Sequence, residues 1–268
     1  MTKLLKVVGA LTTAFVVFVL FSFFGNPVSQ FLVTKNAKDY LKENYPNTDF
    51  KIETVNYDFK TSNYYVQIES PSSLDSSFTL YAGLNGKIDY DTYEDAVVEK
   101  WNTATRINNQ YWDAVKALFE TEEPAYNFHI AFGNIEFANS DALADESTPK
   151  YAVKTESLEL DGAYDINEFG KQAGHLTIYV YDEDVSYERL NEILLGIRNI
   201  MDEADVSFYV IDCVLEYPRP EDDGAWKEGR VEVMTFLYDD IYEEGLTQRV
   251  RESDEKAKAY YARLDALK

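Results

Sequence analysis

Cysteine and histidine are scarce in this sequence of 268 residues, which holds one cysteine and two histidines. A single thiol, Cys213, can form no disulfide within the chain and cannot build a cysteine metal cluster. The histidines, His129 and His175, lie far apart in the sequence with no cysteine nearby, which is not the ligand spacing of a zinc site. We therefore expect no metal and no cofactor.

Glycine motifs that bind phosphate are also missing. The chain contains 12 glycines, and they form neither G-x-G-x-x-G nor a Walker loop. No G-x-S-x-G elbow marks a serine nucleophile. Cys213 stands among large apolar residues, where a thiol stays protonated and unreactive. These absences predict a protein that is not an enzyme and has no catalytic residues.

Basic side chains are few compared with acidic ones. Lysine and arginine number 25 against 48 aspartates and glutamates, which gives a formal net charge of -23. A surface this acidic repels nucleic acid, so we expect no nucleic-acid partner. It suits cations, cationic peptides or simple solubility, and solubility is the interpretation that we favour.

Charged residues are absent from one long stretch, Val7–Gly25. An apolar run of about 18–20 residues is what a helix needs to cross a hydrocarbon core. We predict a cytoplasmic tail over residues 1–6 and a transmembrane anchor over residues 7–25 that contacts the lipid bilayer, with the bulk of the chain outside the cytoplasm. A cleaved signal peptide and a buried core helix are the alternatives, and three lysines soon after the run weaken the argument for orientation.

Residues 26–138 are predicted to form a first domain, in which a helix packs on an antiparallel meander. Asn26 is a suitable helix cap and Pro27 a suitable first residue. The apolar residues of this helix recur at helical spacing: Val28, Phe31, Leu32, Ala37, Tyr40 and Leu41. Three strand candidates follow, over residues 49–60, 63–70 and 77–84, with a bulge near Glu53-Thr54 and a turn at Asn85-Gly86.

The first domain is also expected to contain a long helix over residues 92–120. A strand pair over residues 126–137 completes the domain, with Gly133-Asn134 as a candidate for its turn. Residues 139–150 are small, acidic and without periodicity, so we interpret them as a linker.

Residues 151–268 are predicted to form a second domain, a two-layer α/β sandwich, which places the chain in the α+β class. Its central strand lies within residues 206–217, because that segment is apolar on both faces. The other elements are a strand at 152–160, a helix at 165–173, a strand through Leu176, Ile178 and Val180, a helix at 186–204, a strand at 230–238 and a helix at 243–267.

Three residues are weak candidates for a binding role, namely Asp212, His175 and Trp112. Asp212 interrupts the apolar central strand, where a carboxylate needs a partner or a raised pKa. Arg198 or Arg230 is the expected partner. His175 stands at the start of a strand, and Trp112 lies on a different helix face from the other tryptophan of its helix, which makes one of the two a candidate exposed anchor.

Acidic residues cluster in three places, at Asp89–Asp95, Asp182–Asp184 and Glu221–Asp223. None of the clusters matches the EF-hand pattern. The sequence does not decide whether they bind calcium. Asp184 is placed to cap the helix that follows it.

Two parts of the chain resemble a known family. The first domain contains GNPVSQFLVTKNAKDYLKENYPNTDFKIETVNYDFK and then YYVQIESPSSLDSSFTLY, and it resembles the N-terminal domain of the YfjL-like family. The second contains DINEFGKQAGHLTIYV, IDCVLEYP and DIYEEGLTQRV, and it resembles the C-terminal domain of the same family. The resemblance implies a membrane-anchored protein of Bacillus-type bacteria. It implies no reaction, because it brings no catalytic residues with it. More loosely, the first domain looks like a PepSY or cystatin module.

Two functions of different classes follow as expectations. The first is a non-catalytic, membrane-tethered binding or regulatory protein outside the cytoplasm, with an envelope protein or peptide as its partner. The second is a divergent hydrolase that uses carboxylates, centred on Asp212. The absence of a catalytic motif favours the first.

Overall fold

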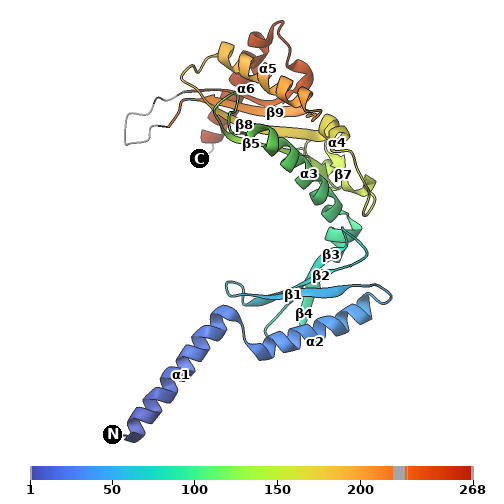
Figure 1. The fold of residues 1–268 in the computed structure, drawn as a ribbon, viewed down its shortest axis with the longest axis vertical. Helices are drawn as coiled ribbons and strands as arrows, with labels where there is room; N and C mark the ends of the chain where they lie inside the picture. The colour runs from blue at the N-terminus through green and yellow to red at the C-terminus, as the bar shows by residue number, and fades with distance from the viewer. Residues whose placement is uncertain (1, 220–226, 228, 267–268) are drawn as a thin grey trace. The chain divides into compact units, whose positions relative to one another are not determined.

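The computed structural model describes residues 2–219, 227 and 229–266. The chain divides into two compact units, shown in Figure 1. Unit 1 comprises Met1–Thr103 with Leu158–Gly162, and unit 2 comprises Ala104–Ser157 with Ala163–Lys268. The division falls inside a helix rather than in the expected linker at 139–150.

The N-terminal segment forms helix α1, Thr2–Phe24. The hydroxyls of Thr12 and Thr13 donate to the carbonyls of Val8 and Gly9, each at 3.0 Å. A helix needs about 20 predominantly apolar residues to span a membrane. No helix in the described part of the chain is long and apolar enough to do so. The segment is therefore helical as expected, but the transmembrane helix over residues 7–25 is not supported.

Helix α2, Pro27–Asn44, begins as the sequence predicts. The Asn26 side chain accepts a hydrogen bond from the Ser29 backbone N–H at 2.8 Å, which satisfies one of the free donors of the first turn. Not all of the apolar residues that recur at helical spacing are buried, because Val28 and Phe31 are 69% and 68% exposed. The helix instead buries every fourth residue: Ser29, Val33, Ala37 and Leu41.

Unit 1 contains a four-stranded antiparallel sheet in the order β1-β2-β3-β4. Its strands are β1 Lys51–Asp58, β2 Asn63–Glu69, β3 Ser77–Ala82 and β4 Ile88–Asp91. The register of β1 shifts between Ile52 and Thr54, which confirms the predicted bulge. Strand β4 was not predicted from the sequence, because its four residues are too few to show alternation.

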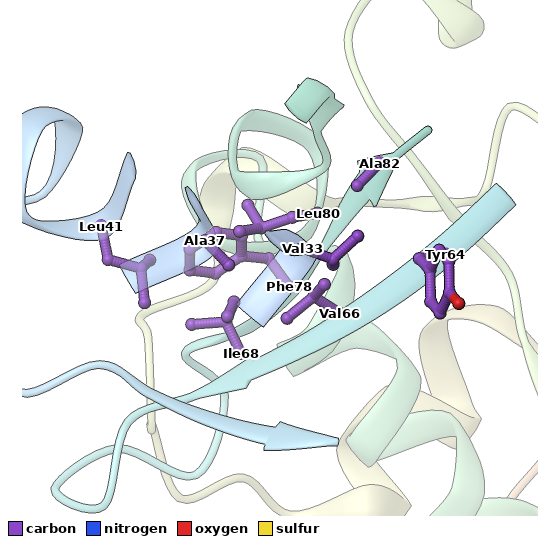
Figure 2. Packing of buried hydrophobic residues seen from close by; sticks show 9 residues of the cluster. All are labelled: Val33, Ala37, Leu41, Tyr64, Val66, Ile68, Phe78, Leu80 and Ala82. Atoms are coloured by element: carbon purple, nitrogen blue, oxygen red, sulfur yellow. The ribbon is translucent and has the colours of Figure 1, made fainter. Parts of the chain in front are cut away.

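Alternate residues of β2 and β3 point to the α2 side of this sheet and form its core. Figure 2 shows them facing the apolar residues of α2, with Leu41 near one end of the cluster and Tyr64 near the other. The cluster consists of Val33, Ala37, Leu41, Tyr64, Val66, Ile68, Phe78, Leu80 and Ala82.

The helix expected over residues 92–120 is interrupted. A single π-helical turn, η1, spans Glu94–Val98, and α3 spans Trp101–Phe119. Between them Lys100 takes a left-handed φ of 61°, a conformation that cannot continue a right-handed helix.

Unit 2 contains a mixed four-stranded sheet in the order β10-β9-β8-β5. Strand β8 runs parallel to β9 and antiparallel to β5, while β10 runs antiparallel to β9. The strands are β5 Phe128–Ile135, β8 Gly174–Tyr181, β9 Val210–Glu216 and β10 Arg230–Leu237. Helix α5, Tyr187–Glu203, makes the crossover between the parallel strands, as a parallel connection requires.

Strand β5 is continuous, so the strand pair predicted over residues 126–137 is wrong. Gly133 lies inside the strand instead of in a turn. A Cβ atom there would lie 2.8 Å from both Tyr111 Cε1 and Val115 Cγ2 of α3. The glycine therefore permits close approach of a helix, a role that a sequence pattern does not distinguish from a turn.

Shorter elements complete unit 2. Strands β6, Phe137–Ala138, and β7, Val153–Lys154, form a parallel pair, and the strand expected over 152–160 is reduced to β7. The remaining elements are η2 Ala142–Ala144, η3 Thr155–Ser157, α4 Ile166–Ala173, η4 Tyr238–Asp240 and α6 Leu246–Asp265. The described part of the chain is thus a mixed α/β structure with one antiparallel sheet, one mixed sheet and one two-stranded parallel sheet.

Candidate functional site

The outer face of the unit 2 sheet gathers polar and aromatic side chains. In β8, Leu176, Ile178 and Val180 are fully buried. The intervening residues, His175, Thr177, Tyr179 and Tyr181, are half-buried on the other face. Because β9 runs parallel to β8 with Thr177 opposite Asp212, Asp212 shares this face with His175.

His175 lies between two carboxylates. Its Nδ1 is 3.1 Å from Glu136 Oε1, and its Nε2 is 3.1 Å from Asp212 Oδ2. The first contact has hydrogen-bond geometry. The second is an ion-pair contact without that alignment, which leaves the buried Nε2 without a hydrogen bond. The three side chains, which we call the ion cluster, are 19%, 31% and 29% exposed for His175, Glu136 and Asp212.

Hydrogen bonds to the backbone position both carboxylate-bearing residues. Glu136 follows β5, and its backbone N–H donates to Ala173 while its carbonyl accepts from the Val153 N–H. Asp212 Oδ1 accepts from the Thr235 N–H at 2.5 Å. Thr235 has a left-handed φ of 49° at the point where β10 shifts register. One oxygen of Asp212 therefore holds this bulge while the other faces His175.

The surroundings of His175 favour its charged form. Burial alone lowers the pKa of an imidazole, but the interactions with Asp212 and Glu136 outweigh burial and raise the pKa of His175 to about 9. Burial also raises the pKa of nearby Tyr151, and the negative charges of Glu136 and Asp212 add to this effect. At neutral pH the cluster therefore contains a cationic imidazole between two carboxylates beside a neutral phenol.

His129 occupies the same face in the opposite charge state. Its ring stacks on Tyr181 with centroids 3.7 Å apart and planes at 5°, and it meets Tyr179 edge-on at 5.7 Å. Nε2 lies 3.4 Å from Glu216 Oε1. Burial lowers the pKa of His129 although Glu216 acts in the other direction. We call His129, Tyr179 and Tyr181 the aromatic patch.

The predicted candidates have mixed outcomes. Asp212 and His175 lie together, but the predicted arginine partners of Asp212 are wrong. Arg198 donates to the Ile241 carbonyl and lies 3.6 Å from Asp202. Arg230 pairs with Glu232 at 3.1 Å. The structure satisfies Asp212 through histidine and backbone instead.

Trp112, the third candidate, is not a member of the ion cluster. It stacks on Phe132 of β5 with ring centroids 4.7 Å apart and planes at 21°. It is half-buried, so packing accounts for its position. Cys213 is fully buried, and burial raises the pKa of its thiol, as expected for an unreactive core cysteine.

The acidic clusters serve local structure where the chain is described. Asp91 accepts hydrogen bonds from the hydroxyls of Tyr40 and Tyr45 at 2.6 and 2.8 Å. Asp182 pairs with Arg189 at 2.8 Å. The cap of α5 is Ser186 and not Asp184. The cluster Glu221–Asp223 lies outside the described residues, and within the described ones no group of three or more His, Cys, Asp or Glu side chains is arranged to hold a metal ion.

Glu136 and Tyr151 were not predicted as site residues from the sequence. Glu136 was placed within a strand pair that does not exist, and Tyr151 stood at the edge of the expected linker. The β6-β7 pair, in which Phe137 lies opposite Val153, places Glu136 in the ion cluster and Tyr151 near it. A two-residue pairing leaves no periodic signal in a sequence.

Comparison with known protein families gives two matches. The model of the YfjL-like N-terminal domain matches residues 1–92, and that of the YfjL-like C-terminal domain matches residues 110–251. All three members of the ion cluster lie in the second match. Comparisons with curated proteins and with solved structures find no match. The two family matches cover most of the chain, and the protein therefore belongs to the YfjL-like family.

Proposed function

We propose that this member of the YfjL-like family is a non-catalytic binding or regulatory protein. The observation that carries the proposal is the double pairing of His175. Both ring nitrogens face carboxylates at 3.1 Å, and the raised pKa keeps the ring protonated at neutral pH. A general base needs a free lone pair near the working pH, and a protonated imidazole has none.

The aromatic patch supplies a surface suited to a protein or peptide partner. Tyr179, Tyr181 and His129 lie together on a half-buried sheet face, where the His129 ring stacks on Tyr181 and meets Tyr179 edge-on. Ile130, opposite Tyr179 in the sheet, is 39% exposed beside them. Tyrosine is enriched at interfaces because one end is apolar and the other stays hydrated.

Location outside the cytoplasm, with α1 as a membrane tether, is the second part of the proposal. It rests on the uncharged sequence from Val7 to Gly25 and on the exposure of described apolar side chains of α1, such as Leu11 and Phe15 at 66% each. Protease treatment of intact cells tests it. Loss of a C-terminal epitope without lysis supports an exterior location, and survival of the epitope until the cells are broken contradicts it.

Site-specific photo-crosslinking tests the binding surface. A photoreactive phenylalanine replaces Ile130 on the aromatic-patch face, and a matched chain carries it at Glu255, which is exposed on α6. We expect one dominant envelope protein or peptide to crosslink to position 130 and not to position 255. Equal crosslinking at both positions, or none at 130 across several growth conditions, would contradict the proposal.

One observation favours the alternative, a carboxylate-based hydrolase: Glu136 and Asp212 meet in one cluster. The imidazole occupies the space between them, where an inverting hydrolase would need a water molecule. Turnover of envelope peptides or glycans by the purified chain, abolished by Asp212→Asn, would support a hydrolase. Binding without turnover would exclude it for those substrates.

A further inference from the structure

A pocket of about 580 Å³ opens in unit 1 beside the last turn of α2, away from the ion cluster in sequence. The turn after α2 and the first residues of β1 complete its wall. Its apolar lining comes from Leu41, Tyr45, Phe50 and Ile52. Leu41 is also a member of the buried cluster near one end, as Figure 2 shows. The volume lies within the range of small-molecule sites, which is about 300–1,000 Å³.

The apolar lining is held rigidly from behind. The Tyr45 hydroxyl donates to Asp91 at 2.8 Å, and its ring contacts Phe50, Phe78 and Tyr93 with centroids 4.7–5.7 Å apart. Phe50 in turn meets Phe78 edge-on at 5.1 Å. A wall that is fixed before a ligand arrives loses little conformational freedom on binding, which favours affinity.

Three lysines line the same pocket, and no acidic residue does. They are Lys38 and Lys42 of α2 and Lys51 of β1, and all are exposed. Within the described residues none of their ammonium groups forms an ion pair with a carboxylate. In a chain with 48 acidic and 25 basic side chains, an acid-free group of three lysines around an apolar surface is a local reversal of charge.

Helix geometry explains only part of this arrangement. Lys38 and Lys42 lie one turn apart near the C-terminus of α2, where positive charge complements the helix dipole. Lys51 belongs to a strand and has no such role. Its neighbour across the sheet is Glu69, and among the described residues no ion pair joins the two side chains. Lys51 lines the pocket together with the two helical lysines.

We propose that this pocket binds a soluble amphipathic anion, with an apolar chain against Tyr45, Phe50 and Ile52 and a carboxylate head between the three lysines. The apolar wall gives affinity for the chain, and the ammonium groups select the negative head. The site is separate from the aromatic patch, so its presence does not depend on the function proposed above.

Calorimetric titration of the full chain with dodecanoate below its micelle concentration tests this proposal. The key variant carries Lys38→Gln, Lys42→Gln and Lys51→Gln. A control variant carries Lys35→Gln, Lys60→Gln and Lys87→Gln, which removes the same charge from exposed sites of unit 1 outside the pocket. Both variants replace solvent-exposed side chains, and circular dichroism verifies that they fold.

We expect saturable binding of dodecanoate to the native chain and the control variant, and at least about tenfold weaker binding to the key variant, which corresponds to 1.4 kcal/mol. Dodecyltrimethylammonium, which has the same chain and a positive head, should bind the native chain more weakly. Equal binding of both amphiphiles, equal loss in the two lysine variants, or no saturable binding of dodecanoate would overturn the proposal. Crosslinking at position 130 is unaffected by any of these outcomes, so the two proposals fail separately.

Discussion

The outer faces of the two sheets carry different kinds of polar side chain. In unit 1, Tyr65, Tyr81 and Tyr90 form a row across β2, β3 and β4. Tyr65 and Tyr81 meet edge-on with centroids 4.9 Å apart, and Tyr81 stacks on Tyr90 at 4.4 Å. In unit 2 the corresponding face holds the ion cluster and the aromatic patch. The first face carries a row of phenol rings, and the second contains two imidazoles whose protonation differs.

The two units are alike in the cores that stabilise them and differ in the ionisable side chains of their outer faces. Both units bury alternate apolar strand residues on one face, so their cores follow the same rule. The outer face of unit 1 contains no histidine, while that of unit 2 contains both histidines of the chain. Ionisation near neutral pH should therefore change unit 2 and leave the tyrosine row of unit 1 unchanged.

The largest effects should come from the two cores, where the units are alike. Leu80 of β3 and Ile178 of β8 are both fully buried. Leu80→Ala and Ile178→Ala should each reduce the free energy of unfolding by about 2–5 kcal/mol, because each leaves a cavity in a packed core. Urea denaturation followed by circular dichroism measures both. A cost below about 1 kcal/mol for either would show that its unit is not packed as described.

The next effect concerns Asp254, a buried carboxylate of unit 2. Asp254 of α6 is 0% exposed and accepts from the Tyr187 hydroxyl at 2.9 Å, from Lys258 Nζ at 2.6 Å and from the Glu232 N–H at 3.2 Å. Asp254→Ala should cost about 3 kcal/mol, because it leaves buried donors without partners. The burial of Asp254 was not predicted from the sequence, which indicated only a helix over residues 243–267.

Lys258→Ala is the matched control for Asp254→Ala. Lys258 is 57% exposed, so its removal should cost less than about 1 kcal/mol. Equal costs for the two variants would mean that the ion pair, and not the buried carboxylate, stabilises α6 against β10.

A smaller effect should appear in the pH dependence of stability. The pKa of His175 is raised from 6.5 to about 9 by folding, so the folded state holds this proton more tightly than the unfolded state. The resulting stability is fully present below about pH 6.5 and is lost as the pH rises through 9. We expect a loss on the order of 1–3 kcal/mol over this interval.

Unfolding free energies across this pH interval, for the native chain and His175→Gln, measure that loss. The variant should show a much shallower decline, because glutamine does not titrate. An unchanged slope in His175→Gln would assign the pH dependence to other groups and remove the contrast between the two sheets.

The smallest effect belongs to the tyrosine row of unit 1. A double-mutant cycle with Tyr81→Ala and Tyr90→Ala should give a coupling of about 0.5–1.5 kcal/mol for the stacked pair. Desolvation raises the pKa of Tyr90 above its ordinary 10.0, so the coupling should be the same at neutral pH and near pH 9. A coupling that falls over this range would show that the row is ionised and unlike our description.

The sequence predicts elements whose signal is local and periodic. The alternation of Leu176, Ile178 and Val180 identifies β8, and Asn26-Pro27 identifies the start of α2. The double-sided apolar pattern of residues 206–217 identifies β9 as a central strand. Each of these signals depends on neighbours in the sequence, which experience the same packing in three dimensions.

The ion cluster has no such signal. Glu136 reaches His175 through the short β6-β7 pairing, and Asp212 is satisfied by Thr235 in a bulge of β10. The contacts join β5, β8, β9 and β10, and no spacing in the sequence encodes them. The same holds for Gly133, whose role depends on Tyr111 and Val115 of α3. The sequence identified Asp212 and His175 as unusual residues but could not bring them together.

The charge state of His175 is the central claim, and nuclear magnetic resonance titration tests it most directly. The chain has only two histidines, so ring-nitrogen spectra contain two sets of signals, and His129→Gln assigns them. We predict that His175 is protonated at pH 7 and titrates near 9, while His129 is neutral and titrates below 6.5. A neutral His175 at pH 7, with a free ring nitrogen, would contradict the account and restore it as a candidate general base.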